Sequence, residues 1–251
     1  MAGAAVQRGA WYRRGVRPVL VLWDVDYTLV ATDGVGWYLY EAALRQLYGL
    51  EMPTGLGSMA GRTDTSIALE VLAAAGLPDP ADEVRPFQRL LAELTPGLHS
   101  MVAERGRVLP GVPAALTAVA HQADGDRLVV QSLLTGNIPE LARVKLGALG
   151  LTEHLDLAAG AYGDISPFRA DLVPVARQNA ARRYGADFSG RSTVLVGDTP
   201  SDIEAAAISG ARSVGVATGR FTMDELASAG ADVVLADLTG TEAAVAAVLG
   251  E

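Results

Sequence analysis

Short apolar runs alternate with helical patterns along most of the chain, and this alternation restricts the fold more than any other feature of the sequence. The first run, residues 19–23, is apolar throughout and ends at an aspartate, which is typical of a strand buried on both faces of a parallel sheet. Helical patterns at 139–149 and 172–184 lie between later runs. Those later runs are 127–134, 157–161, 193–196, 213–216 and 233–235. The alternation predicts an α/β fold built on a doubly wound parallel sheet.

The interval 36–107 interrupts this alternation. It carries three helical patterns, at 37–48, 65–75 and 84–94, and no clear strand. Gly and Pro clusters between these patterns are typical breaks between helices. We therefore predict an inserted all-α cap at 36–107. The α/β core is predicted to consist of 18–35 and 108–251, preceded by a basic, flexible N-terminal arm at 1–17.

Composition excludes several classes of protein. The net charge of -9 disfavours a nucleic-acid-binding surface, since phosphate backbones are bound by clusters of Lys and Arg. No apolar run reaches the roughly 18 residues that a membrane span requires. Cysteine is absent, which excludes disulfides and thiolate catalysis. We expect a cytoplasmic protein that is a monomer or a homodimer, with no nucleic-acid or membrane partner.

Polar residues follow several of the predicted strands. Asp24, Asp26 and Thr28 follow the first strand, and Thr135 follows the second. The third predicted strand is followed by the segment that holds Arg169, and the fourth by Asp198 and Asp202. Ligands of open α/β sheets bind beyond the carboxyl ends of the strands, so the sequence predicts one site that gathers these residues.

In their order and placement these residues resemble the motifs of the haloacid dehalogenase superfamily. The shared pattern is Asp-x-Asp-x-Thr, then a Ser or Thr, then a basic residue, then a closing acidic motif. The resemblance covers about residues 18–238 and points to its phosphoglycolate phosphatase and β-phosphoglucomutase-like subgroup, whose members carry a helical cap. It implies a Mg²⁺-dependent phosphatase that acts on a phosphate monoester through a transient aspartyl-phosphate on Asp24.

The residue types suit that chemistry. A carboxylate such as Asp24 can accept a phosphoryl group, because the mixed anhydride that forms is readily hydrolysed. Asp26 is expected to act as general acid and base. Oxygen ligands suit Mg²⁺. We expect the side chains of Asp24 and Asp198 to bind the ion and, by resemblance, the backbone carbonyl of Asp26 to be a third ligand. Asp202 is either a further ligand or a support for the others, and the alternative is that Asp198 and Asp202 only cap the following helix.

The loop after the second strand is the expected phosphate site. Thr135 offers a hydroxyl, and the amides of Gly136 and Asn137 lie at the start of the next helix, where phosphate binds favourably. Pro139 suits the first turn of that helix. Thr28 is also counted among the substrate- and phosphate-binding residues; it either orients Asp26 or its loop or has a structural role only. Tyr27 departs from the family pattern, in which glycine is usual at that position.

The basic residue has two candidates. Arg169 has the spacing that the resemblance predicts, between the Thr and the closing acidic motif. Lys145 is the only lysine of the chain and lies some six residues into the preceding helix. That is roughly 9 Å along the helix axis, so we expect Lys145 to point away from the strand ends. Arg169 is therefore the favoured residue.

In the family that the sequence resembles, the corresponding helical cap closes over the site. This implies a small phosphorylated metabolite as substrate. Arg62, in the segment 61–64, is a candidate for gripping an anion or hydroxyl of that substrate. Against this, Asp64 is a plausible N-cap for the next helix, which would give the segment a structural role.

Other functions remain to be distinguished. A phosphosugar mutase uses the same core groups, and the sequence does not separate it from a phosphatase. A phosphonate hydrolase would need a lysine in the cap, and the cap has none. A dinucleotide-binding domain would need a Gly-rich turn after the first strand, which is missing. From another class, a receiver-type or non-catalytic phosphate-binding protein conflicts with the large insertion and with the full set of catalytic groups.

Overall fold

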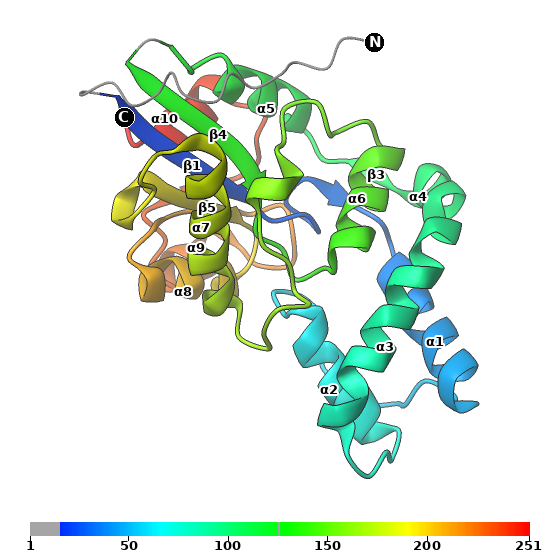
Figure 1. The fold of residues 1–251 in the computed structure, drawn as a ribbon. Helices are drawn as coiled ribbons and strands as arrows, with labels where there is room; N and C mark the ends of the chain where they lie inside the picture. The colour runs from blue at the N-terminus through cyan, green and yellow to red at the C-terminus, as the bar shows by residue number, and fades with distance from the viewer. Residues whose placement is uncertain (1–15, 125) are drawn as a thin grey trace.

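The structure is a computed structural model, and it describes residues 16–124 and 126–251. Five strands form a central sheet in the order β4-β1-β5-β6-β7, and every neighbouring pair is parallel. Their bounds are β1 Arg17–Trp23, β4 Arg127–Leu133, β5 Thr193–Gly197, β6 Arg212–Val216 and β7 Val233–Leu235 (Figure 1). The predicted arm at 1–17 lies outside the described residues except for Val16 and Arg17.

Helices cover both faces of the sheet, as the alternation predicts. Within β1, Leu20 and Leu22 face one layer, and Val21 and Trp23 face the other. The first layer contains α7 Leu172–Tyr184 and α8 Pro200–Ser209; the second contains α5 Val112–Ala120, α6 Pro139–Ala148 and α10 Thr241–Leu249. A further helix, α9 Met223–Ser228, packs beside β6 and β7. All four β1 side chains are fully buried, so the doubly wound α/β fold is confirmed.

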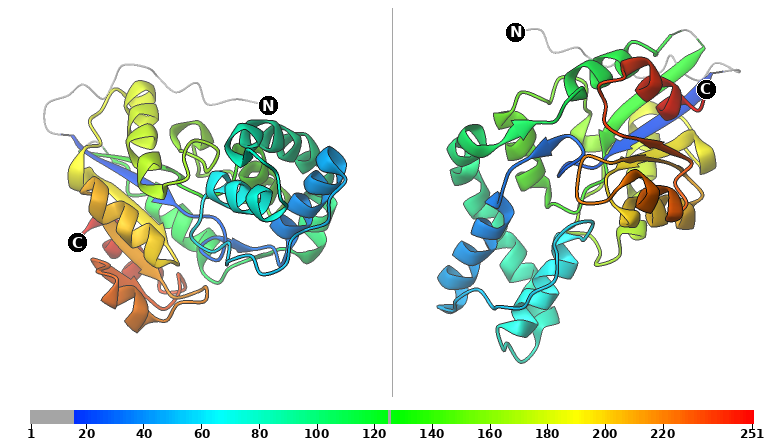
Figure 2. Two further views of the ribbon diagram at one scale, coloured as in Figure 1. Left: turned by 90° about the horizontal axis from the view of Figure 1, so that it is seen from below. Right: turned by 180° about the vertical axis from the view of Figure 1, so that it is seen from behind.

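A separate group of helices lies beyond the carboxyl ends of β1 and β4 (Figures 1 and 2). It comprises α1 Val35–Tyr48, α2 Asp64–Ala74, α3 Pro80–Leu94, α4 His99–Arg105 and the 3-10 turn Thr95–Leu98. These helices have their own apolar core, which Ile138 and Leu141 beside the sheet also join. They form the helical cap.

The chain enters and leaves the cap through a short antiparallel pair. Strand β2 Val30–Ala31 pairs with β3 Arg107–Val108, so the outgoing and returning segments lie side by side. The predicted cap boundaries at 36 and 107 lie next to this pair and stay predictions. Among the described residues, no helix combines the length and apolar character needed to cross a bilayer.

One predicted strand is wrong. Residues 157–161 form a 3-10 turn, Leu157–Ala159, and only Ala161 joins the sheet edge, through a bridge to Leu134. The cause is local: the side chain of Asp156 accepts a hydrogen bond from the amide of Ala158 and so caps the turn.

Candidate active site

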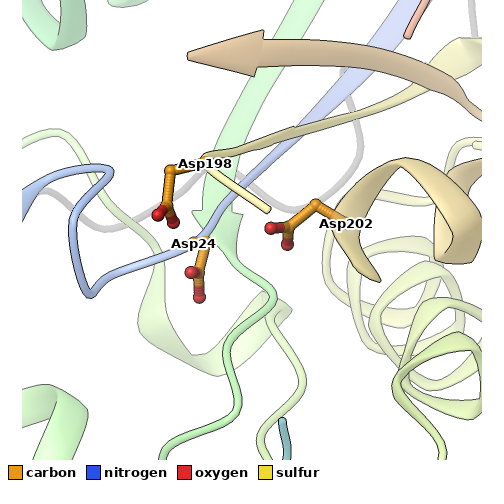
Figure 3. Close-up of side chains that lie close together, drawn as sticks. All are labelled: Asp24, Asp198 and Asp202. Carbon is orange, nitrogen blue, oxygen red and sulfur yellow. The ribbon is translucent and has the colours of Figure 1, made fainter. Parts of the chain in front are cut away.

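Three aspartates meet at the carboxyl edge of the sheet. Asp24 follows β1, Asp198 follows the neighbouring β5, and Asp202 lies in the first turn of α8 (Figure 3). All three are buried, and one carboxylate oxygen of each lies within 4.8 Å of the others. Parallel neighbours end at the same edge, which is why residues so far apart in sequence form one cluster.

Arg169 joins this cluster as its cation. Its Nη2 lies 2.8 Å from Asp24 Oδ1 and 2.7 Å from Asp202 Oδ1, and it donates a hydrogen bond to the carbonyl of Leu134 at 3.0 Å. The side chain is buried. The structure thus places Arg169 against the predicted nucleophile, as the favoured sequence interpretation expects.

The cluster has more acid than base, and its pKa values reflect this. Burial raises the pKa of Asp24 to about 6, although Arg169 opposes the shift. Burial and then the neighbouring Asp24 and Asp202 raise the pKa of Asp198 to about 8. Burial opposes the charge of Arg169, but the Asp202 and Asp24 carboxylates outweigh it and raise the pKa of that guanidinium. A further positive charge would therefore stabilise the ionised cluster.

Lys145 does not point away from the strand ends, and that prediction is wrong. Its Nζ lies 2.7 Å and 2.6 Å from the two carboxylate oxygens of Asp26, and its side chain is only 3% exposed. The prediction counted rise along the helix axis but neglected the side chain. Helical side chains lean toward the helix N-terminus, so a long one in the second turn of α6 reaches back to the sheet edge.

The loop after β4 forms a small hydrogen-bonded network with Asp26. Asn137 Nδ2 donates to Asp26 Oδ2 at 2.7 Å and to Thr135 Oγ1 at 2.9 Å. Pro139 opens α6, as predicted, but the residue at the N-cap is Ile138, so Asn137 does not cap this helix. The side chain of Asn137 instead orients the two groups predicted for catalysis and phosphate binding.

Thr28 and Tyr27 occupy the turn after Asp26. Thr28 is fully buried, and its hydroxyl donates to Asp198 Oδ1 at 3.4 Å, so this side chain is hydrogen-bonded to the acidic cluster. Tyr27 has a φ of 57°, in the left-handed region that glycine tolerates best. A glycine therefore suits this position, and Tyr27 accepts a backbone strain that glycine would avoid.

Asp202 has one structural partner in addition to Arg169, namely Thr199. Its Oδ2 accepts hydrogen bonds from the amide and the hydroxyl of Thr199, at 3.1 Å and 2.7 Å, which completes a capping box at the start of α8. The helix-capping interpretation thus holds for Asp202, while Asp198 makes no such cap. Both oxygens of Asp202 are already engaged, which favours a supporting role over direct metal ligation.

The cap reaches the site through its segment 61–65, called the cap loop below. The amide of Asp64 donates to the carbonyl of Gly136 at 2.7 Å, and the amide of Thr65 donates to that of Gly163 at 2.9 Å. A Cβ on Gly136 would lie 1.9 Å from the carbonyl oxygen of Arg62, so the close approach requires glycine there.

Asp64 is buried in this contact and is not the N-cap of α2, so that prediction is wrong. Thr63 is the N-cap, and its side chain accepts a hydrogen bond from the amide of Ser66. Asp64 lies one residue further, where its carboxylate accepts from the Tyr40 hydroxyl at 2.7 Å and the Ile138 amide at 2.6 Å. Burial raises its pKa to about 6, against these hydrogen bonds.

Arg62 lines the site but is held within the cap. Its guanidinium pairs with Glu70 and donates to the Ser66 carbonyl at 2.9 Å. The structure therefore brings Arg62 to the cavity wall without directing it at Asp24.

A cavity of about 560 Å³ separates core and cap at this point. The core side includes Asp24, Asp26, Lys145 and Arg169, and the cap side includes Trp37, Tyr40, Met59 and Arg62. The polar groups at the bottom and the mixed wall above them are typical of a site for a small molecule.

The acidic cluster fits a divalent metal ion. Its donors are all oxygens, they are close enough to share one ion, and three carboxylates face the single cation of Arg169. Carboxylate oxygens are the ligands that hard divalent cations prefer. Asp24 and Asp198 retain oxygens free of ion pairs for such a role.

The sequence analysis considers Lys145 but places it away from the strand ends, and it gives Asp64 only a helix-capping role. The side-chain direction in a helix would have placed Lys145 correctly. For Asp64 the sequence offers no comparable signal, because its position depends on how the cap packs against α6.

Comparisons with known proteins identify the family of this chain. Residues 21–207 match the family model described as haloacid dehalogenase-like hydrolase. The protein named "Probable phosphatase IndB" from Dickeya dadantii is 29% identical, over 86% of this chain and 88% of its own length. A phosphoglycolate phosphatase from Cupriavidus necator is 34% identical, over 76% of this chain and 77% of its own length.

Solved structures share the fold. CbbY from Rhodobacter sphaeroides, determined in complex with phosphate, superposes with a TM-score of 0.62 at 17% identity, covering 88% of this chain and 95% of that one. A haloacid dehalogenase-like hydrolase from Streptococcus pneumoniae gives 0.61 at 14% identity, covering 90% and 98%. The family match covers well over half of the chain, so this protein is an enzyme that belongs to the haloacid dehalogenase-like hydrolase family.

Proposed function

We propose that this enzyme is a Mg²⁺-dependent phosphatase that hydrolyses a small-molecule phosphate monoester through an aspartyl-phosphate on Asp24. The observation that carries the proposal is the pairing of Asp24 with Arg169 at 2.8 Å, beside Asp26 and at the bottom of a cavity. Two relatives named as phosphatases, one a phosphoglycolate phosphatase, support a small phosphorylated metabolite as the substrate.

The first step forms the covalent intermediate. A carboxylate oxygen of Asp24 attacks the phosphorus, and the bond from phosphorus to the ester oxygen breaks. Asp26, as the carboxylic acid, gives its proton to that oxygen, so the leaving group departs as an alcohol. Thr135 and the amides of Gly136 and Asn137 hold the phosphate oxygens, together with Arg169, whose buried Nε has no hydrogen-bond partner among the described residues.

The second step releases the phosphate. The Asp26 carboxylate takes a proton from water, and the water oxygen attacks the phosphorus of the intermediate. Inorganic phosphate leaves, and the carboxylate of Asp24 and the acid form of Asp26 are restored. When bound by Asp24, Asp198 and the backbone carbonyl of Asp26, Mg²⁺ supplies the positive charge that screens the phosphate from the carboxylates.

The other predicted residues have supporting roles in this proposal. Asp202 holds Arg169 and the start of α8, and Thr28 orients Asp198 through its hydrogen bond. Arg62 contacts the part of the substrate that lies under the cap. Closure of the cap keeps bulk water from the reacting groups.

A phosphate-release screen tests the proposal. Purified protein is incubated with Mg²⁺ and a panel of phosphorylated acids, sugars and alcohols, with Asp24→Asn in parallel. Asp187→Asn, on an exposed loop, is the matched control. We expect release from at least one substrate, full activity of the control and a loss of about 10⁴-fold or more in Asp24→Asn.

Two results would contradict the proposal. Release that is equal in Asp24→Asn and in the unmodified enzyme would show that Asp24 is not the nucleophile. Transfer of the phosphate to a second position on a sugar, without release, would identify a mutase.

A further inference from the structure

Lys145 is a second buried cation of the site, and the roles proposed above do not use it. It lies in the second turn of α6, and it is the only lysine of the chain. Its ammonium contacts both oxygens of Asp26 and donates to Asn137 Oδ1 at 2.8 Å. Three acceptors surround a group that has three N–H donors, so its orientation is fixed.

The two cations of the site form ion pairs with different carboxylates. Arg169 pairs with Asp24 and Asp202, whereas Lys145 pairs with Asp26 alone. Asn137 joins the second group, since it donates to Asp26 Oδ2 while it accepts from Lys145. One cation thus holds the proposed nucleophile, and the other holds the proposed acid and base.

The helix that carries Lys145 is itself held from two sides. Ala142 and Leu146 of α6 pack into the core of the sheet, while Ile138 and Leu141 pack into the core of the cap. A side chain on a helix fixed in this way can hold a partner within the narrow geometry that proton transfer needs.

We propose that Lys145 is a positioning residue, which holds the Asp26 carboxyl where it can protonate the leaving group and then deprotonate water. The proposal rests on the function proposed above. A purely structural role would have a different signature. The Asp26 side chain is 35% exposed, so loss of Lys145 leaves it in contact with water and should disturb folding little.

Kinetics with two kinds of leaving group test the proposal. The variants are Lys145→Met, which keeps the length without the charge, and Lys145→Arg, which keeps the charge. Arg143→Met is the matched control, because Arg143 is on the same helix with a side chain 52% exposed. Thermal unfolding of each variant checks that it is folded.

An alkyl phosphate, the best one from the release screen, needs a proton on its leaving oxygen, whereas p-nitrophenyl phosphate does not. With the alkyl phosphate, we expect Lys145→Met to lower kcat by about 10²-fold or more, with KM within about 3-fold. With p-nitrophenyl phosphate, we expect a burst of one nitrophenolate per site followed by slow turnover, because only the second step still needs Asp26. Lys145→Arg should recover part of kcat, and Arg143→Met should match the unmodified enzyme.

The proposal is overturned if Lys145→Met behaves like Arg143→Met. It is also overturned if the loss lies in KM with kcat unchanged, because Lys145 would then bind substrate directly. Inactivity of the unmodified enzyme on every phosphate ester would contradict the proposed function instead.

A spectroscopic experiment tests the contact without any activity. Protein labelled with ¹⁵N at the lysine Nζ gives one side-chain signal, because the chain has one lysine. We expect a protected ammonium signal that shifts or broadens in Asp26→Asn and is unchanged in Asp187→Asn. A signal that does not respond to Asp26→Asn would refute the contact on which the proposal depends.

Discussion

The carboxyl edge of the sheet and the cap loop meet across one cavity, yet they are held by different forces. At the sheet edge, buried side chains of opposite charge contact one another, as Arg169 contacts Asp24 and Asp202. The cap loop is held mainly by backbone hydrogen bonds, from the amides of Asp64 and Thr65 to core carbonyls. Charge dominates the first region, and close approach of two backbones dominates the second.

This difference separates chemistry from access. The sheet edge carries more buried carboxylates than buried cations. Its stability and activity should therefore respond to added cations and to removal of a charge. The cap loop carries a single buried carboxyl, that of Asp64, so it should respond to protonation and to changes of shape. Changes confined to one region should therefore have a signature that changes in the other region lack.

Arginines on the two sides give the largest expected contrast. Arg169→Ala leaves the acidic cluster without its cation, and we expect a loss in kcat of about 10²- to 10³-fold. The same change should destabilise the fold by about 3 kcal/mol, because buried carboxylates lose their partner. Arg62→Ala should instead raise KM by about 10-fold with kcat nearly unchanged.

Steady-state kinetics and urea unfolding measure both effects, and Arg169→Lys controls for charge. Equal patterns in the two alanine variants would show that the regions do not divide chemistry from substrate contact.

Removal of metal should affect the sheet edge alone. We expect a chelator to abolish phosphate release and Mg²⁺ to restore it. At 100 times its Kd, Mg²⁺ should also stabilise the folded protein by about 3 kcal/mol, since the ion binds the native cluster. Thermal unfolding with and without Mg²⁺ measures this stabilisation. The stabilisation by Mg²⁺ should be lost in Asp198→Asn and retained in Asp64→Asn. An equal loss in both variants would contradict the difference between the sheet edge and the cap loop.

The pH dependence of stability should identify the cap loop through Asp64. Burial raises the pKa of Asp64 from 3.8 to about 6, so the folded state binds this proton more tightly than the unfolded state. The resulting stability is present below the unfolded pKa and is lost as pH rises through about 6.

Asp64→Asn removes this dependence. Relative to the variant, the unmodified protein should lose about 2 kcal/mol of unfolding free energy between pH 4 and pH 7.5. Urea unfolding across that pH range measures it. A difference that stays constant with pH would show that Asp64 does not titrate in the folded cap.

Tyr27 gives the smallest expected effect, and it lies at the sheet edge. Its positive φ costs a residue with a Cβ about 1 kcal/mol, and glycine removes that strain while losing some chain entropy. We expect Tyr27→Gly to raise the unfolding free energy by up to about 1 kcal/mol, with kcat retained within about 3-fold. A clear destabilisation would show that contacts of the tyrosine ring outweigh the strain.

The same two regions differ in how well the sequence predicts them. The cavity is lined by Asp24, Asp26, Thr135 and Asp198, because strand order and the parallel sheet determine which strand ends meet. Arg169 lines it too, although the strand predicted before it is a 3-10 turn. Apolar runs and their polar ends are local patterns, so they can be read directly from the sequence.

The contacts of the cap were not predictable in this way. The buried position of Asp64 depends on the contact between the start of α2 and the residues just before α6, and backbone hydrogen bonds leave little trace in residue type. Lys145 lies between these cases: its helix was predicted, but its direction follows from side-chain geometry that sequence spacing does not include. The 3-10 turn at Leu157–Ala159 was missed because one capping side chain outweighed an apolar run.

Trapping the covalent intermediate is the most direct test of the central claim. The enzyme is mixed with ³²P-labelled substrate, quenched in acid within one turnover and treated with borohydride, which reduces an acyl phosphate to an alcohol. Peptide mass spectrometry then locates the reduced residue. We predict an acid-stable, base-labile label and homoserine at the position of Asp24 alone. Turnover without such a label, or with the label on any other residue, would contradict the account.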